Sequence, residues 1–213
     1  MYNPKHFEET RLEVLHALVR AHPLCTLVTV SDDGLTANYI PLLVRTGTTP
    51  AGVLVGHVAR ANPVWRATKM EVPVLALFQG PQHYISPSLY ATKVEHGKVV
   101  PTWNYVAVQA KGLLQVHDDA DWVRHQVTEL TAQQESSQPA PWAVGDAPRD
   151  YTDTIIRALV GIEISIDSLV GKWKVSQNQA AVNRASVITG LQAQGHADAR
   201  AMADLAELFA PPG

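Results

Sequence analysis

The possible folds are limited most by a series of short apolar runs, rich in β-branched residues and separated by turn residues. Residues 24–44 contain two such runs on either side of Ser31-Asp32-Asp33-Gly34, which predicts a β-hairpin. Residues 53–57 and 72–79 have the same character, and Gly80-Pro81 is expected to end the last run. Because these runs do not alternate regularly with helical segments, they disfavour a doubly wound parallel sheet and favour a closed or half-closed antiparallel barrel.

Helical periodicity marks other segments, which we expect at the periphery of the barrel. Long helices are expected at residues 6–21, 118–134, 150–158, 180–193 and 197–209. A short helix is expected to begin at Asn62 and Pro63, and a strand is expected at residues 160–166. The prediction is a mainly β protein with peripheral helices, an α+β fold. Residues 1–134 are expected to form the barrel core with its N-terminal helix, residues 135–150 a linker-like loop, and residues 151–213 the completing strand and the C-terminal helices of the same domain.

The charge balance argues against a nucleic-acid-binding protein. The 17 Lys and Arg residues are outnumbered by 20 Asp and Glu residues, which gives a net charge of -3. Non-specific nucleic-acid binding depends on neutralised phosphates. The last two predicted helices have the outline of a helix-turn-helix, but Arg184 and Arg200 are their only fixed positive charges. We therefore expect them to pack or to form a dimer rather than to read DNA.

The cysteine content and the hydropathy of the sequence indicate the cellular compartment in which the protein is expected. Cys25 is the single cysteine and lies in an apolar run, so a buried, unreactive thiol is expected. The sequence has neither a cysteine pair nor a His-Glu-x-x-His motif, and no metal site is predicted. No stretch approaches the ~20 apolar residues of a spanning helix, and the N-terminus lacks a signal core. These features predict a cytoplasmic protein with no membrane segment.

Residues 56–65 run from a strand end through Arg60 and Asn62 into a helix opened by Pro63. Free backbone N–H groups at a helix start and an adjacent guanidinium suit a phosphate monoester. Asn62 can equally be an ordinary cap, with Arg60 solvated, and the spacing alone favours that simpler interpretation.

Two further clusters have open alternatives. Residues 84–90 and 101–105 mix aromatic rings with amides and hydroxyls, which suits either a planar ligand or a subunit interface. In residues 171–178, two lysines precede Ser176, Gln177 and Asn178. These side chains could hold an anion, or they could cap the next helix while the lysines point to water.

Taken together, the clusters resemble the PaiB-like family of FMN-binding negative transcriptional regulators. The resemblance follows the family's motif order over nearly the whole chain. It rests on Met1-Tyr2-x-Pro4-x-His6-Phe7, Gly56-His57-x-Ala59-Arg60-x-Asn62-Pro63, Phe78-Gln79-Gly80-Pro81, Tyr84-Ile85-Ser86-Pro87, Pro101-Thr102-Trp103-Asn104-Tyr105 and Lys174-x-Ser176-Gln177-Asn178.

The resemblance implies a split β-barrel of the pyridoxamine-phosphate-oxidase-like kind, with FMN at a homodimer interface. It makes Arg60 the expected phosphate partner, with Asn62 and His57 beside it. It also makes Trp103, Asn104 and Tyr105 candidates for the isoalloxazine edge or the partner's wall, and Lys174 and Gln177 candidates for the ribityl or phosphate end.

Three functions are compatible with these features. The resemblance favours an FMN-binding homodimer that regulates transcription, acting indirectly because a DNA-reading helix is lacking. A flavin-dependent oxidoreductase or related split-barrel enzyme, acting on a small or planar substrate such as haem, is the alternative, since a fold does not fix a function. An interaction module without cofactor is the third. The sequence alone identifies no general acid or base, so catalysis is left open.

Overall fold

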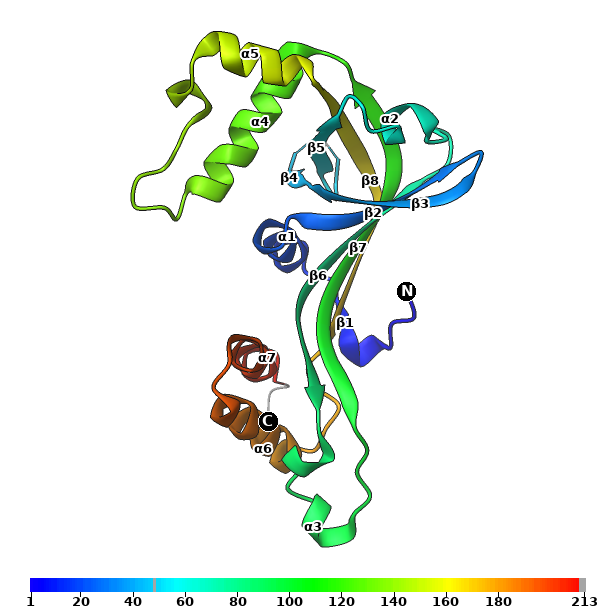
Figure 1. Cartoon of the computed structure of the whole chain (residues 1–213). Coiled ribbons are helices and arrows are strands. Elements are labelled where there is room, and N and C mark those ends of the chain that lie inside the picture. Colours follow the sequence, from blue (N-terminus) through cyan, green and yellow to red (C-terminus); the bar gives the residue numbers. More distant parts are fainter. Residues whose placement is uncertain (48, 211–213) are drawn as a thin grey trace. The chain divides into compact units, whose positions relative to one another are not determined.

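The computed structural model describes residues 1–47 and 49–210. Within them eight strands form an antiparallel sheet in the order β3-β2-β6-β7-β8-β5-β4, with β1 paired to β8. The strands are β1 (Glu8–Glu9), β2 (Leu24–Ser31), β3 (Gly34–Pro41), β4 (Leu43–Arg45), β5 (Val53–Ala59), β6 (Val74–Ile85), β7 (Thr102–His117) and β8 (Leu159–Lys174). The sheet confirms the predicted α+β class (Figure 1).

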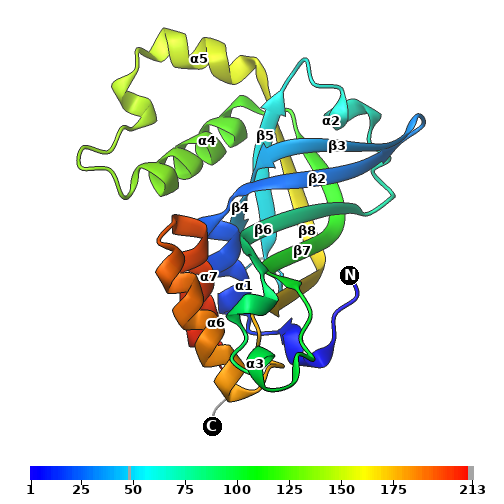
Figure 2. The same ribbon diagram turned by 60° about the horizontal axis from the view of Figure 1, so that its bottom comes forward.

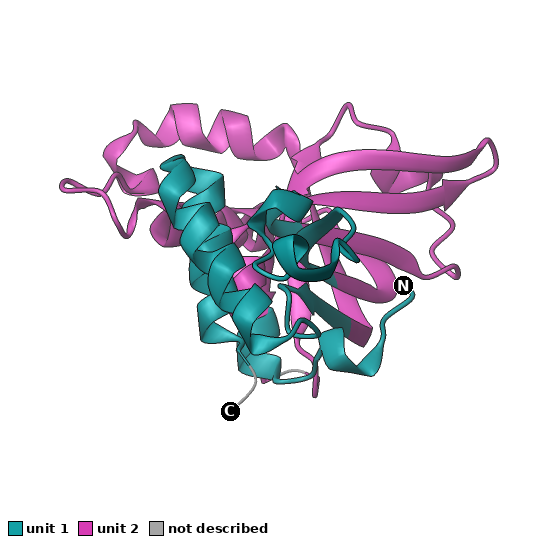
Figure 3. Ribbon diagram, turned by 90° about the horizontal axis from the view of Figure 1, so that it is seen from below, with its two compact units in different colours: residues 1–15, 79–108, 170–213 teal, residues 16–78, 109–169 magenta. Residues whose placement is uncertain are grey.

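The chain divides into two compact units (Figure 3). Unit 1 comprises residues 1–15, 79–108 and 170–213, and unit 2 comprises residues 16–78 and 109–169. The long strands β6, β7 and β8 contribute residues to both.

Unit 2 contains the predicted hairpin, in which β2 and β3 pair from Leu24↔Pro41 to Ser31↔Gly34. Gly34 has a φ of 103°, which explains why glycine ends this turn. β5 pairs with β4 on one side and with β8 on the other. The helices of this unit are α2 (Val64–Ala67), α4 (Ala120–Glu135) and α5 (Arg149–Arg157), together with the second half of α1 (Leu12–Ala21) and the short turn η3 (Val144–Asp146). Its apolar core includes Leu27, Leu42, Leu54, Phe78, Ile162 and Ile164.

Unit 1 contains α6 (Ala181–Gln194) and α7 (Ala197–Leu208), which lie side by side (Figure 2). Val187 and Leu191 of α6 and Met202 and Ala203 of α7 are fully buried, so these helices pack through their apolar sides. The unit also holds η1 (Lys5–Phe7), η2 (Pro87–Leu89) and α3 (Lys93–His96).

Several expected boundaries are wrong. The N-terminal helix begins at Leu12 rather than at residue 6, because Glu8 and Glu9 pair with Lys172 and Gly171 of β8. β6 continues through Gly80-Pro81 to Ile85. Its pairing with β2 ends at Leu77, so beyond this point the missing N–H of Pro81 removes no hydrogen bond to β2.

The third error concerns the strand expected at 160–166, which is the longer β8. In the hairpin, β3 ends at Pro41, and the following residues form β4, which pairs with β5 instead of β2. The helices α4, α5, α6 and α7 lie close to their predicted positions. Asp119 caps α4, as the acidic run before it predicts, by accepting from the N–H groups of Asp121 and Trp122.

Candidate functional site

Arg60 follows the last residue of β5, and the protein itself engages its guanidinium. Two of its N–H groups donate to the Asp118 carboxylate, at 3.0 and 2.5 Å, and two others donate to the carbonyls of Arg157 (2.9 Å) and Leu159 (3.1 Å). This hydrogen bonding lowers the pKa of Asp118. Four of the five N–H donors are therefore used, and one is left for a ligand.

Asn62 and His57 also have partners within unit 2. The Asn62 side chain accepts from the Val64 N–H and donates to Asn38, each at 3.0 Å, so it stabilises the start of α2 and connects it to β3. His57 Nδ1 lies 2.7 Å from Oε1 of Gln126, a fully buried residue of α4. The glycine before His57 is required by packing, because a Cβ at Gly56 would lie 2.9 Å from the Pro41 carbonyl oxygen.

In unit 1, two lysines alternate along β8, and the first of them lies beside aromatic rings. Lys172 is only 7% exposed; its Nζ donates to the Tyr2 carbonyl at 3.0 Å and lies 5.3 Å from the centre of the Tyr105 ring. Lys174 donates to the Thr102 hydroxyl. Among the described residues, neither ammonium lies within salt-bridge distance of a carboxylate, although Glu8 is opposite Lys172 in the strand register.

Burial lowers the pKa of Lys174, and the nearby positive charge of Lys172 lowers it further, while Tyr105 opposes the change. Each ammonium has three N–H donors and uses one of them on the protein. The Lys172–Lys174 pair can therefore offer several donors and two positive charges to an anion or to carbonyl oxygens.

The predicted amides hold the turn that follows β8. Asn104 is buried and donates to the Ser176 hydroxyl at 2.8 Å. Ser176 has a φ of 70°, a conformation that only this non-glycine residue adopts in the described part of the chain. Gln177 accepts from the Val175 N–H at 2.8 Å and donates to the Trp173 carbonyl. Both amides are thus engaged by the protein, and their contact with a ligand stays a prediction.

Trp103 is the most exposed of the predicted site residues of unit 1. Its side chain is 52% exposed and meets Tyr84 of β6, itself 45% exposed, with ring centres 6.0 Å apart in an edge-on arrangement. Because Trp103 and Tyr105 alternate along β7, both rings extend from the same side of that strand. Aromatic side chains and lysines therefore occur together in this part of unit 1.

The structure groups the predicted residues by unit. His57, Arg60 and Asn62 belong to unit 2, and Trp103, Asn104, Tyr105, Lys174 and Gln177 belong to unit 1. From the sequence, Lys172 is only one of the two lysines of residues 171–178, and the site implied by the resemblance contains Lys174 alone. The alternation of the two lysines along a strand is the signal that places them on the same side.

The other expectations concern metals, membranes and Cys25. Cys25 is buried, and burial raises its pKa to about 12, which accords with an unreactive thiol. Across residues 1–47 and 49–210, no three His, Cys, Asp or Glu side chains gather in a way that could hold a metal ion. Over the same residues, the helices are too short or too polar to span a bilayer.

The family model with the description "Putative FMN-binding domain" matches residues 1–168. The chain belongs to this FMN-binding family. The match includes the segment around Arg60 and the Trp103–Tyr105 motif, and it ends before Lys172. FMN is the cofactor of this family, and therefore of this chain.

Two relatives extend the similarity along the chain. An uncharacterized protein of Emericella nidulans is 36% identical over 88% of this chain and 88% of its own length. The protease synthase and sporulation protein PAI 2 of Bacillus subtilis is 30% identical over 97% of both chains. The second relative confirms the PaiB-like resemblance, and its alignment continues past residue 168.

Solved structures show the same fold at low sequence identity. The FAD and heme binding protein from Mycobacterium smegmatis superposes with a TM-score of 0.56 and 19% identity, covering 78% of this chain and 73% of that chain. The flavocytochrome Anf3 from Azotobacter vinelandii gives a TM-score of 0.56 and 12% identity, with coverages of 78% and 69%. The predicted split β-barrel is confirmed.

The chemistry of unit 1 fits FMN. FMN has an anionic phosphate and a planar ring system with carbonyl oxygens at its edge, and it needs cationic donors and flat apolar surfaces. Lys172 and Lys174 supply charge and N–H donors, and no carboxylate of residues 1–47 and 49–210 forms an ion pair with them. Trp103 and Tyr105 supply rings. In unit 2, Arg60 offers one remaining N–H.

Proposed function

We propose that this chain is a homodimeric FMN-binding protein of the PaiB type, which represses transcription without contacting DNA itself. The observation that carries the proposal is the Lys172–Lys174 pair: within the described part of the chain neither ammonium has a carboxylate at salt-bridge distance, and Lys172 lies beside Tyr105. Placing such charges in a partly buried position is unfavourable unless a ligand pairs with them. An anionic flavin supplies that partner.

In this proposal, Lys172 and Lys174 donate to the anionic or carbonyl groups of FMN, and Trp103 and Tyr105 lie against its ring system. Asn104 and Gln177 maintain the turn at Ser176 through their amides, next to Lys174 in the sequence. The predicted phosphate contact of Arg60, with His57 and Asn62 beside it, remains part of the proposal. The Arg60 contact is limited to one hydrogen bond while Asp118 holds the guanidinium.

The proposed homodimer is supported by exposed aromatic surface in unit 1. Trp103 and Tyr84 together present two large, half-exposed rings. Aromatic residues are enriched at subunit interfaces, and two neighbouring exposed rings offer a flat contact surface to a second copy. Trp103→Glu is expected to convert a dimer into a monomer, as measured by light scattering, whereas Lys111→Glu on the same strand leaves the mass unchanged.

The proposed indirect action is supported by the chemistry of α6 and α7. The guanidinium of Arg200 donates to the Gly195 carbonyl, and Arg184 lies 3.5 Å from the Gln179 carbonyl. The second helix also carries Asp198, Asp204 and Glu207. A DNA-reading helix needs several cations that neutralise phosphates beside its base-reading side chains, and Arg184 and Arg200 are the only fixed cations of these two helices.

A flavin-dependent oxidoreductase is the second candidate, and the lowered pKa of Lys174 favours it. Because burial lowers the pKa of Lys174, its ammonium gives up a proton more readily than an ordinary lysine does. FMN would supply the redox chemistry when bound. Lys174 would then hold the proton on its Nζ, and Thr102 would orient the ammonium through its hydroxyl.

The proposal is tested by titrating the purified protein with FMN and following flavin fluorescence. Lys172→Met is expected to raise the dissociation constant about tenfold or more, because one charge-assisted hydrogen bond contributes about 1.5–3 kcal/mol. Lys111→Met is the matched control, because Lys111 is exposed on β7. Equal affinities of wild type and Lys172→Met would overturn the assignment of the lysine pair.

A further inference from the structure

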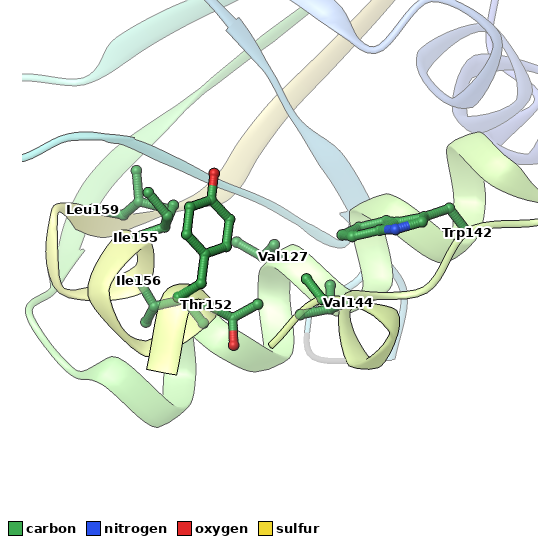
Figure 4. Close-up of a pocket in the computed structure, with 9 residues that line it drawn as sticks. Val127, Trp142, Val144, Thr152, Ile155, Ile156 and Leu159 are labelled. Atoms are coloured by element: carbon green, nitrogen blue, oxygen red, sulfur yellow. The ribbon is translucent and has the colours of Figure 1, made fainter. Parts of the chain in front are cut away.

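An apolar cavity of about 150 Å³ lies in unit 2, among α4, the segment before α5, and α5 itself (Figure 4). It does not involve the residues proposed to bind FMN. Side chains from these elements and from the start of β8 line it, among them Val127, Trp142, Ala147, Ile155, Ile156 and Leu159. This region was predicted as a linker-like loop, so its participation in a cavity is a finding of the structure.

Three polar side chains in or beside the cavity are already paired within the protein. The Thr152 hydroxyl, which also lines the cavity, donates to the Arg149 carbonyl at 2.9 Å. Arg124 and Asp153, from α4 and α5, form an ion pair with each other. An ion that entered the cavity would lose its hydration without gaining a free partner among these residues. The lining therefore selects against charged ligands.

Aromatic rings surround the mouth of the cavity. Trp142 is 47% exposed and Tyr151 is 61% exposed, so two aromatic rings and the half-exposed Ile155 surround an opening that water can reach. Rings of this kind contact another ring edge-on or face-on at favourable distances. The cavity is thus both accessible and lined by groups that attract aromatic molecules.

We propose that this cavity binds an uncharged monocyclic aromatic molecule. Its volume sets the size of the occupant, since an apolar cavity of about 150 Å³ accommodates a molecule as large as benzene. Its lining consists almost wholly of carbon atoms, which favours an uncharged ligand. The cavity is a second ligand site of the chain, separate from the flavin, and it is independent of the proposed function.

The test is a ¹⁹F NMR titration of the full chain with fluorobenzene. Saturable broadening and a shift of the fluorine resonance are expected, and 4-fluorobenzoate is expected to bind at least about tenfold more weakly because its carboxylate finds no partner. Ala147→Leu fills the cavity and is expected to abolish binding. Ala143→Leu is the matched control, because Ala143 lies on the same segment but is exposed and outside the lining.

Val127→Phe provides a second way to fill the cavity from α4, and circular dichroism establishes that each variant is folded. The proposal is overturned if fluorobenzene gives no saturable shift, if both filled variants bind it like the wild type, or if 4-fluorobenzoate binds equally well. A change in molecular mass on Ala147→Leu, without fluorobenzene binding to the wild type, would instead assign the cavity to a side chain of a second copy. The Lys172→Met variant is expected to retain fluorobenzene binding, so the outcome is independent of the flavin site.

Discussion

Substitution of Lys174 tests how this side chain contributes to flavin binding. Its ammonium uses one N–H on Thr102 and has two left. A charge-assisted hydrogen bond contributes about 1.5–3 kcal/mol, and the partial exposure of Lys174 places it at the lower end. Since about 1.4 kcal/mol corresponds to a tenfold change in affinity, Lys174→Met is expected to raise the dissociation constant of FMN about tenfold near neutral pH.

The pH dependence provides a sharper test than the affinity alone. Burial lowers the pKa of Lys174, so its ammonium loses the proton at a lower pH than an ordinary lysine does. FMN affinity of the wild type is expected to fall as the pH rises through this lowered pKa. Lys174→Arg is expected to keep its affinity over the same range, because guanidinium stays charged. Fluorescence titrations from about pH 7 to about pH 10 measure both profiles.

The flavin-free protein should show a change of the opposite sign. Because the pKa of Lys174 is lower in the folded chain than in the unfolded chain, the unfolded chain binds more protons between the two values. Stability is therefore expected to rise with pH across that window, and Lys174→Met removes this part of the rise. The reasoning is refuted if Lys174→Met binds FMN with the wild-type affinity and pH profile, as Lys111→Met should.

Other substitutions test separate features. Arg60→Ala is expected to raise the dissociation constant of FMN, whereas Asp118→Asn frees the guanidinium and should preserve or improve binding; equal losses in both variants would assign Arg60 a structural role. Gly161→Ala places a Cβ 2.3 Å from the Trp122 ring and is expected to destabilise the fold by about 1–3 kcal/mol in urea unfolding, while Gly145→Ala, which meets no atom within 4 Å, is neutral. Native Cys25 is expected to resist iodoacetamide at neutral pH, and rapid alkylation would contradict its burial.

Local signals predicted the elements whose cause is local. The hairpin turn at Gly34 and the cap at Asp119 lie within a few residues of the structure that they specify, so the sequence indicated both. The pairing of Glu8 and Glu9 with β8 depends on residues at the other end of the chain, and no local pattern contains it. Because this distant pairing was not visible in the sequence, the predicted N-terminal helix included Glu8 and Glu9 and was too long.

In the candidate site, too, residues with a local sequence signal were predicted, and residues that depend on distant partners were not. The sequence identified Lys174 from its motif, but Lys172 depends on the carbonyl of Tyr2, which lies 170 residues earlier. Whether a lysine points to water or to a carbonyl is decided by such distant partners. The amides of Asn104 and Gln177 were recognised as polar groups, but their partners, Ser176 and the backbone beside it, could be found only in the structure.

The pairing of β5 with β8 has a consequence for synthesis of the chain on the ribosome. Val53 pairs with Ser165 and Ala59 with Leu159, so β5 receives its second neighbour only roughly a hundred residues after it is made. At about 5–20 residues per second, its open edge waits for several seconds or longer. Leu54 and Val55, which end fully buried, are among the residues of that strand. A nascent chain that stalls before β8 therefore presents an apolar strand edge to chaperones or to other nascent chains.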